Sequence, residues 1–166
     1  MVSSNIPFGN TRVYDRDFDR SEDAVRKYSL AAVHNYFFLK GMDTLREGGI
    51  LAYITTSGVM DSPQNRPVRE WLVNHANLVS AIRLPDNAFR KNAGTDVVSD
   101  ILFLQKRDCA SLEQPEWVQL DTTPEGYRMN AYFVRHPEMV LGELSVESTQ
   151  YGKQEVTVLS LIHISE

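Results

Sequence analysis

The chain has 166 residues, of which 42% are hydrophobic and 23% are charged, with one cysteine and a formal net charge of −5. This ordinary globular composition excludes a fibre, a disordered tail and a membrane-spanning protein. The lone Cys109 cannot form an internal disulfide, and the chain does not open with a basic segment followed by an apolar run; we therefore expect a cytoplasmic protein. The negative charge opposes binding to a nucleic-acid backbone unless basic residues gather on one face.

The first predicted elements are a strand end and a long helix. Residues 2–5 look like the end of a strand with no strand before it, so we expect a chain truncated at its N-terminus. Residues 21–47 are predicted to be helical, because acidic residues near the start suit the positive end of a helix. Apolar positions also recur there every three or four residues, at Leu30, His34, Phe37, Phe38, Met42 and Leu45.

The next segments alternate between strand and helix patterns. Residues 50–56 are a nearly continuous apolar and β-branched run, which is typical of a strand covered on both faces in a parallel sheet. A helix is predicted from about residue 66 to residue 77. Strands are predicted over residues 78–84 and 100–106, with a loop over 85–99. This alternation predicts an α/β fold.

The C-terminal third carries weaker patterns. Residues 117–120 suggest a short strand, and a His136-Pro137 break interrupts the segment that follows. We treat residues 108–155 as an extension of uncertain structure. Residues 156–166 are either a non-native tail, since their end resembles translated sequencing-adapter read-through, or a short hydrophobic strand at Val156-Thr157-Val158.

Several common site patterns are missing from the sequence. It contains no glycine-rich phosphate loop, no Cys-x-x-Cys pair and no His-Glu-x-x-His. Asp15-x-Asp17-x-Asp19 resembles the start of a calcium loop, but Arg20 and Arg26 stand where that loop needs Gly and Glu. We expect a solvated loop there and no metal site.

The most informative segment is Asn5-Ile6-Pro7-Phe8-Gly9, which follows the first apparent strand. Ligands of open α/β sheets bind at the carboxyl ends of strands, so the position suits a binding site. Taken alone, an Asn and a Pro in a turn need no function beyond turn geometry.

In its context, Asn5-Ile6-Pro7-Phe8 resembles the Asn-Pro-Pro-Phe/Tyr motif of DNA adenine-N6 methyltransferases that use S-adenosylmethionine. The later elements follow the order of that family, including a loop that bears Phe89. The order is most similar to methylase subunits of type I restriction systems and to methylase regions of large helicase-containing proteins of bacterial mobile elements. The resemblance covers roughly residues 2–107, and residues 130–142 resemble the mobile-element group.

The resemblance implies a partial Rossmann-like, class I S-adenosylmethionine-dependent methyltransferase fold. Residues 1–107 would be its catalytic half, containing only the later strands and helices of the sheet. The main S-adenosylmethionine-binding elements are then expected upstream, so this chain alone would be inactive and would leave an exposed sheet edge. The implied partners are DNA, the missing N-terminal cofactor-binding part and helicase or specificity domains, all in the bacterial cytoplasm.

The resemblance also implies a role for each residue of the motif. The Asn5 side-chain oxygen and the Ile6 carbonyl would each accept one hydrogen of the adenine amino group, while Pro7 stiffens the turn. Phe8 would stack on a base flipped out of the duplex, with Phe89 as a second aromatic wall. Ile6 departs from the more usual Pro, which predicts a less rigid turn.

Other readings of these residues stay open. Phe89 could instead fill the core beneath its loop, and His34 suits a structural role better than acid or base catalysis. Arg90 and Lys91 could contact a DNA phosphate or form an ordinary exposed loop. At the level of function, the alternatives are a non-catalytic methyltransferase-like module that binds DNA or protein, and an enzyme that methylates another nitrogen or RNA.

Overall fold

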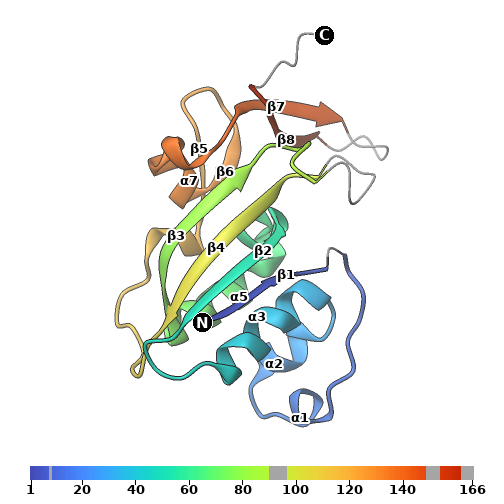
Figure 1. Cartoon of the computed structure of the whole chain (residues 1–166), viewed down its shortest axis with the longest axis vertical. Helices are drawn as coiled ribbons and strands as arrows, with labels where there is room; N and C mark the ends of the chain where they lie inside the picture. The colour runs from blue at the N-terminus through green and yellow to red at the C-terminus, as the bar shows by residue number, and fades with distance from the viewer. Residues whose placement is uncertain (8, 90–96, 149–153, 162–166) are drawn as a thin grey trace.

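The computed structural model describes residues 1–7, 9–89, 97–148 and 154–161. Its centre is a four-stranded sheet in the order β1-β2-β4-β3 (Figure 1). β1 and β2 are parallel, and β4 is antiparallel to both β2 and β3. β1, β2 and β3 therefore end at the same edge of the sheet. The strands are β1 (Val2–Asn5), β2 (Ile50–Thr56), β3 (Ala76–Leu84) and β4 (Ser99–Lys106).

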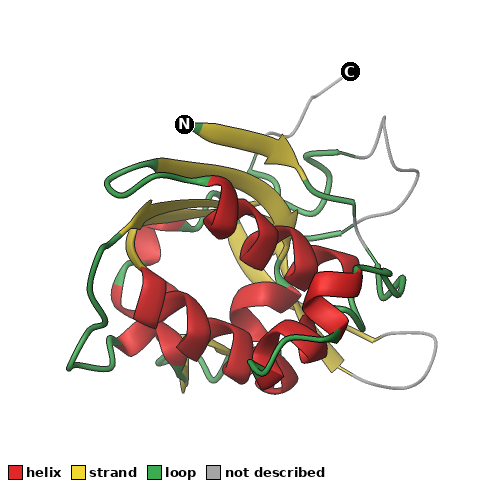
Figure 2. Cartoon of the chain, turned by 90° about the horizontal axis from the view of Figure 1, so that it is seen from below, coloured by secondary structure: helices red, strands yellow, loops and turns green. Residues whose placement is uncertain are grey.

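Helices pack against one face of this sheet (Figure 2). They are α1 (Arg16–Asp19), α2 (Ala24–Ser29), α3 (Val33–Thr44), α4 (Gly58–Asp61), the 3₁₀ turn η1 (Pro63–Asn65) and α5 (Arg66–His75). In the part of the chain that the structure describes, no helix is long and apolar enough to cross a membrane.

Three predicted strands, over residues 50–56, 78–84 and 100–106, and the second predicted helix are confirmed with small shifts. β2 matches its predicted range, β4 begins one residue early, and β3 begins two residues early, directly after α5. The single helix predicted over residues 21–47 is wrong, because the chain breaks between α2 and α3. Ala32 is extended (φ −142°, ψ 122°), and the carbonyl of Leu30 accepts a hydrogen bond of 2.9 Å from the Val13 amide. This tertiary contact outweighs the local helical pattern.

The two faces of the sheet differ in their cover. Leu51 and Tyr53 of β2 are buried on the helix side. Gly41 of α3 allows this close packing, because a Cβ there would lie 2.3 Å from the Tyr53 hydroxyl. On the opposite face, Ile54 and its neighbours are only half-buried. The expectation that β2 is covered on both faces is therefore wrong for the described residues.

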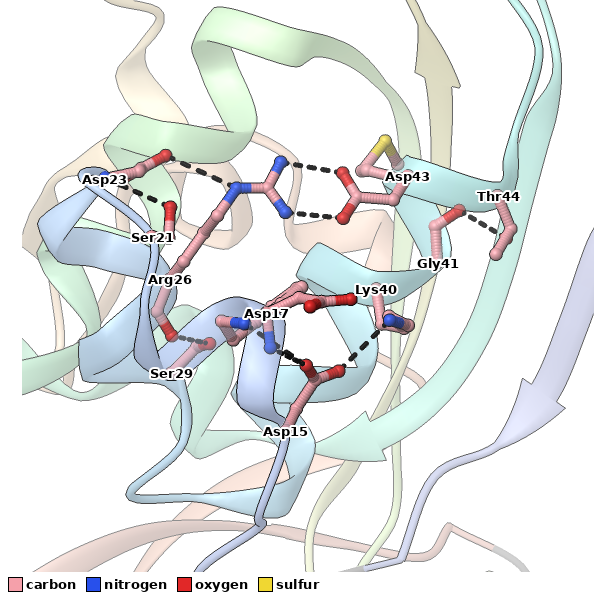
Figure 3. A network of polar contacts seen from close by, with 12 residues as sticks. Asp15, Asp17, Ser21, Asp23, Arg26, Ser29, Lys40, Gly41, Asp43 and Thr44 are labelled. Atoms are coloured by element: carbon pink, nitrogen blue, oxygen red, sulfur yellow. Dashed lines mark hydrogen bonds and ion pairs between the residues drawn. The ribbon is translucent and has the colours of Figure 1, made fainter.

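The segment predicted as a solvated loop is instead the cap of α1. The Asp15 carboxylate accepts the backbone amides of Asp17 (2.9 Å) and Phe18 (3.1 Å), and Lys40 of α3 donates to it at 3.0 Å (Figure 3). The Phe18 amide, the Tyr36 hydroxyl and Lys40, in that order, lower the pKa of Asp15. Asp15 therefore holds α1 against α3.

A second group of charges joins α2 to α3 and α5. The Arg26 guanidinium forms a two-point ion pair with Asp43, with Nη2 2.7 Å from Oδ1 (Figure 3). Asp23 caps α2 and accepts the indole N–H of Trp71 at 2.8 Å. These contacts fix the helical layer beneath the sheet.

The C-terminal segment packs into the same core. Trp117, Val118, Met129 and Phe133 belong to the main hydrophobic cluster. The strand predicted over 117–120 is wrong, because residues 116–118 form a 3₁₀ turn. The break predicted at His136 is confirmed, because α7 ends at Arg135 and His136 is its C-cap. The elements are η2 (Glu116–Val118), β5 (Leu120–Thr122), β6 (Arg128–Asn130), α7 (Ala131–Arg135), η3 (Pro137–Met139), β7 (Glu143–Ser148) and β8 (Gln154–Leu159).

The tail region contains a strand. β8 includes Val156-Thr157-Val158 and pairs with β7 in a hairpin. Its Val158 carbonyl accepts a hydrogen bond of 2.8 Å from the Asp86 amide, just after β3. This part of the tail thus forms the short hydrophobic strand considered in the sequence analysis.

Candidate functional site

The carboxyl edge of the sheet brings the ends of three parallel strands together. Asn5 ends β1, Ser57 follows β2 and Pro85 follows β3. The predicted motif therefore lies at the edge where ligands of open α/β sheets bind.

The motif is anchored through Ile6. Its side chain is 1% exposed in the main core, and its amide donates to the Ile54 carbonyl at 2.9 Å. Asn5 and Pro7 on either side are exposed. Because side chains alternate along a strand, Asn5 points away from the helices while Ile6 points into the core.

The acceptors of the motif are available. No residue that the structure describes donates a hydrogen bond to the Asn5 side chain or to the Ile6 carbonyl. Asn5 is also the first residue of a row that crosses the open face from strand to strand. The other members of the row are Ile54 of β2, Ile101 of β4 and Ile82 of β3. An exposed amide at this edge can hydrogen-bond the edge of a planar ring.

Phe89 lies at the same edge but follows a more distant strand, β3. It is half-buried in the turn that follows β3, where the Ala88 amide donates to the Pro85 carbonyl at 3.0 Å. Three inter-strand steps of about 4.8 Å separate β1 from β3, roughly 14 Å in total. The other predicted contacts, Phe8, Arg90 and Lys91, lie outside the described residues.

A buried ion cluster lies directly behind this edge, on the helix side. Arg83 of β3 is 1% exposed and forms a two-point pair with Asp100 of β4, at 2.8 and 2.9 Å. It forms a second pair with Asp61 of α4, at 2.6 and 3.0 Å. Burial opposes the charge on Arg83, but the attraction of Asp100 and Asp61 raises its pKa overall. The cluster locks the end of β3 to the helix that follows β2.

The members of this cluster are far apart in the chain, so no local pattern predicts that they meet. One pattern could have revealed Asp100, since it is a carboxylate directly before the apolar run of residues 101–104. Such a residue is rarely buried without a partner of opposite charge.

The C-terminal segment reinforces the same cluster. The Asn130 amide donates to Asp61 at 2.9 Å, and its side chain donates to the carbonyls of Met60 and Trp117, each at 2.7 Å. The Arg83 guanidinium lies 4.3 Å from the centre of the Phe133 ring. Residues beyond the predicted catalytic half thus help to hold the edge in place.

His34 contacts the loop that follows the motif. Its Nδ1 lies 3.2 Å from the Gly9 carbonyl, which can only accept a hydrogen bond. The neutral ring therefore carries its proton on Nδ1 and leaves Nε2 as an acceptor. Burial lowers the pKa of His34, partly offset by the bond to Gly9.

This lowered pKa predicts a stability change with pH. The unfolded chain takes up a proton on His34 near pH 6.5, whereas the folded chain does so only at lower pH. The contribution of neutral His34 to the free energy of unfolding is therefore fully present above pH 6.5. This contribution is lost as the pH falls through the folded-state pKa of His34. Urea unfolding of the wild type and His34→Gln should show a steeper loss in the wild type between pH 6.5 and 5. Equal slopes would contradict the assignment.

The fit of S-adenosylmethionine can be judged from the turns at this edge. The turns after β1, β2 and β3 begin with Ile6-Pro7, Ser57-Gly58 and Pro85-Asp86, and none is glycine-rich within the described residues. The described residues also contain no group of three or more His, Cys, Asp or Glu that could hold a metal ion. The turns that the structure describes at this edge therefore do not supply the glycine-rich loop expected for this cofactor.

Comparisons with known proteins agree with this geometry. The sequence model of the family N-6 DNA Methylase matches residues 1–131. The Defense against restriction protein B of Escherichia phage P1 is 28% identical over 116 residues, which are 68% of this chain and 5% of that protein.

Two solved structures share the fold. A protein from Listeria monocytogenes, assigned as a class I S-adenosylmethionine-dependent methyltransferase, matches with a TM-score of 0.51 and 22% identity over 69% of this chain and 33% of its own. A modification subunit assigned to a type I restriction enzyme of Vibrio vulnificus matches with a TM-score of 0.54 and 17% identity over 96% of this chain and 36% of its own. The predicted fold class is confirmed, and this chain spans about a third or less of the proteins that it matches.

Proposed function

This chain belongs to the N-6 DNA methylase family, and on that premise we propose that it holds the target base of a DNA methyltransferase that modifies adenine N6. S-adenosylmethionine would supply the methyl group. The observation that carries the proposal is the pair of available acceptors, the Asn5 side chain and the Ile6 carbonyl, at the carboxyl end of β1.

Adenine N6 needs such acceptors to become a nucleophile. Its lone pair is delocalised into the ring, so the nitrogen gains reactivity when both amino hydrogens are held and the nitrogen becomes more tetrahedral. Asn5 and Ile6 would accept one hydrogen each. The burial of the Ile6 side chain and the bond from its amide to Ile54 hold these acceptors in place.

The aromatic and basic residues complete the proposed site. A base in a duplex must leave the stack before it can be modified, and aromatic faces offset part of the unstacking cost. We assign this role to Phe8 and, from the turn after β3, to Phe89. Arg90 and Lys91, which follow Phe89 in the sequence, would contact a DNA phosphate.

We further propose that the cofactor-binding part precedes β1 and adds a strand to it. β1 is the edge strand of the four-stranded sheet, and its outer side pairs with no described strand. The opposite edge, at β3, is bridged by Val140, and the Leu141 amide donates to the Arg83 carbonyl at 2.9 Å. The half-buried isoleucines of the open face would be covered by the same preceding part.

The test begins with the native locus. Sequencing upstream of Met1 should show a reading frame with a glycine-rich turn after a strand and a later acidic residue. The extended protein should then transfer methyl groups to DNA, with N6-methyladenine identified by mass spectrometry of the nucleosides, while the 166-residue chain alone should not. An extended protein that binds DNA and S-adenosylmethionine without methylating adenine would contradict the proposal and favour a non-catalytic module.

A further inference from the structure

The loop that follows the proposed target-base motif has a single tether among the described residues. At its start the Ile6 amide is bonded to β2, and at its end the Val13 amide is bonded to the C-cap of α2. Between these two points, the described residues form one hydrogen bond, which joins the Gly9 carbonyl to His34 Nδ1 at 3.2 Å. Gly9 has a φ of +135°, a backbone conformation that other residues rarely adopt. His34 therefore holds the loop at the residue where it turns.

The tether starts from a point that is itself held in place. His34 and Asn35 lie in the first turn of α3, and both side chains are buried. Asn35 donates its side-chain NH₂ to Asn65 Oδ1 at 2.9 Å. Asn65 in turn donates its own NH₂ to the Gly58 carbonyl, which can only accept, at 3.0 Å. The first turn of α3 is thus joined to the turn after β2 as well as to the loop after β1.

The loop and the turn that α3 joins line one cavity of about 520 Å³. Gly9 and Asn10 belong to the loop, and Thr56 and Gly58 belong to the end of β2 and its turn. Thr56 lies on the same face of the sheet as Asn5, because it stands two residues after the partner of Asn5 in β2. The cavity therefore belongs to the proposed target-base site.

We propose that His34 is a positioning residue for methyl transfer, whose Nδ1–H keeps the loop after the motif ordered before a flipped base enters. This inference rests on the proposed function. The role requires no proton transfer, because Nδ1 keeps its proton in the neutral and in the charged ring. An ordered loop reduces the entropy that is lost when the base is bound, and it keeps the aromatic ring of Phe8 near its working position.

The first arm of the test uses the 166-residue chain and requires no activity. Ring ¹⁵N chemical shifts above pH 7 should show the proton of neutral His34 on Nδ1 and not on Nε2. The backbone order parameters of Gly9 and Asn10 should be about 0.85 in the wild type and below about 0.6 in His34→Gln, whose amide nitrogen lies where Nε2 was. A proton on Nε2, or an equally ordered loop in His34→Gln, would overturn the inference.

Two variants control for the loss of the imidazole itself. His34→Asn keeps an NH₂ donor near the position of Nδ1, so the order of the loop should return to the wild-type value. His75→Gln changes another histidine whose Nδ1 contacts a backbone carbonyl, that of Trp71 on α5 at 2.6 Å, and should leave the loop unchanged. Circular dichroism checks the fold of each variant. Equal loosening of the loop in His34→Asn and His34→Gln would exclude the Nδ1 donor as its tether.

The second arm connects the loop to catalysis in the extended protein. His34→Gln should lower kcat by about 10–100-fold, since a shift of about 1 Å in a reacting group can cost 10²-fold in rate. KM for DNA should change less, because contacts to the phosphate backbone dominate DNA binding. His34→Asn should recover most of the loss. Wild-type kcat in His34→Gln would overturn this inference alone, whereas an extended protein that methylates no adenine would overturn it together with the proposed function.

Discussion

Replacing Asp100 with alanine is expected to lower the free energy of unfolding by about 3–5 kcal/mol, because it removes one partner of a buried ion pair. Asp100 is fully buried and Arg83 is 1% exposed, so solvent cannot replace the lost carboxylate. Asp61 would remain as the second partner at 2.6 Å, which places the expected loss at the lower end of that range. Urea unfolding followed by far-ultraviolet circular dichroism would measure the change.

The matched control is an exposed ion pair. Arg66 and Glu70 on α5 lie 2.9 Å apart, with side chains that are 53% and 39% exposed. Arg66→Ala should therefore change the free energy of unfolding by no more than about 0.5 kcal/mol. A similar small loss in Asp100→Ala would show that the buried cluster does not hold the carboxyl edge together.

Asn5→Ala is expected to lower the rate of methyl transfer in the extended protein by about 10²–10³-fold, the range found when one such hydrogen-bonding group is lost. Asn5 is exposed and ends β1, so its loss should leave the fold intact. The substrate KM should change less than kcat, because the acceptor acts mainly as charge develops on N6. Initial rates on adenine-containing DNA would measure both constants.

A second exposed asparagine provides the comparison for Asn5. Asn74 lies on α5, away from the carboxyl edge, and Asn74→Ala should keep the wild-type rate. Near-normal activity in Asn5→Ala, with unchanged circular dichroism, would remove Asn5 from the proposed mechanism.

The local pattern of the sequence predicts three strands of the central sheet and one helix of this protein well. The apolar run at residues 50–56, the segment ending at Leu84 and the run after Ser99 all form strands, as expected. Pro67 lies in the first turn of α5 as its fixed φ favours. These elements follow from the spacing of neighbouring residues, so they need no knowledge of the rest of the chain.

The family was also recognisable from residues that are close in sequence. The short motif Asn5-Ile6-Pro7-Phe8 and the order of elements after it identify the methylase family, and the family match confirms this reading. The roles of Asn5, Ile6, Phe8 and Phe89 stay predictions, because the motif alone does not position a base.

The way in which these elements combine depends on contacts between distant segments. The tertiary structure breaks the expected long helix at Ala32, inserts antiparallel β4 between β2 and β3, and leaves one face of β2 open. It also joins Arg83 to Asp61 and Asp100, and Asn35 to Asn65, which lie 17 to 30 positions apart. Periodicity reports which face of an element is apolar, whereas the partner of a buried charge or amide depends on contacts between distant segments. Local patterns of residues therefore predict the main strands, one helix and the family, whereas the packing of distant residues creates the ion cluster and anchors the motif.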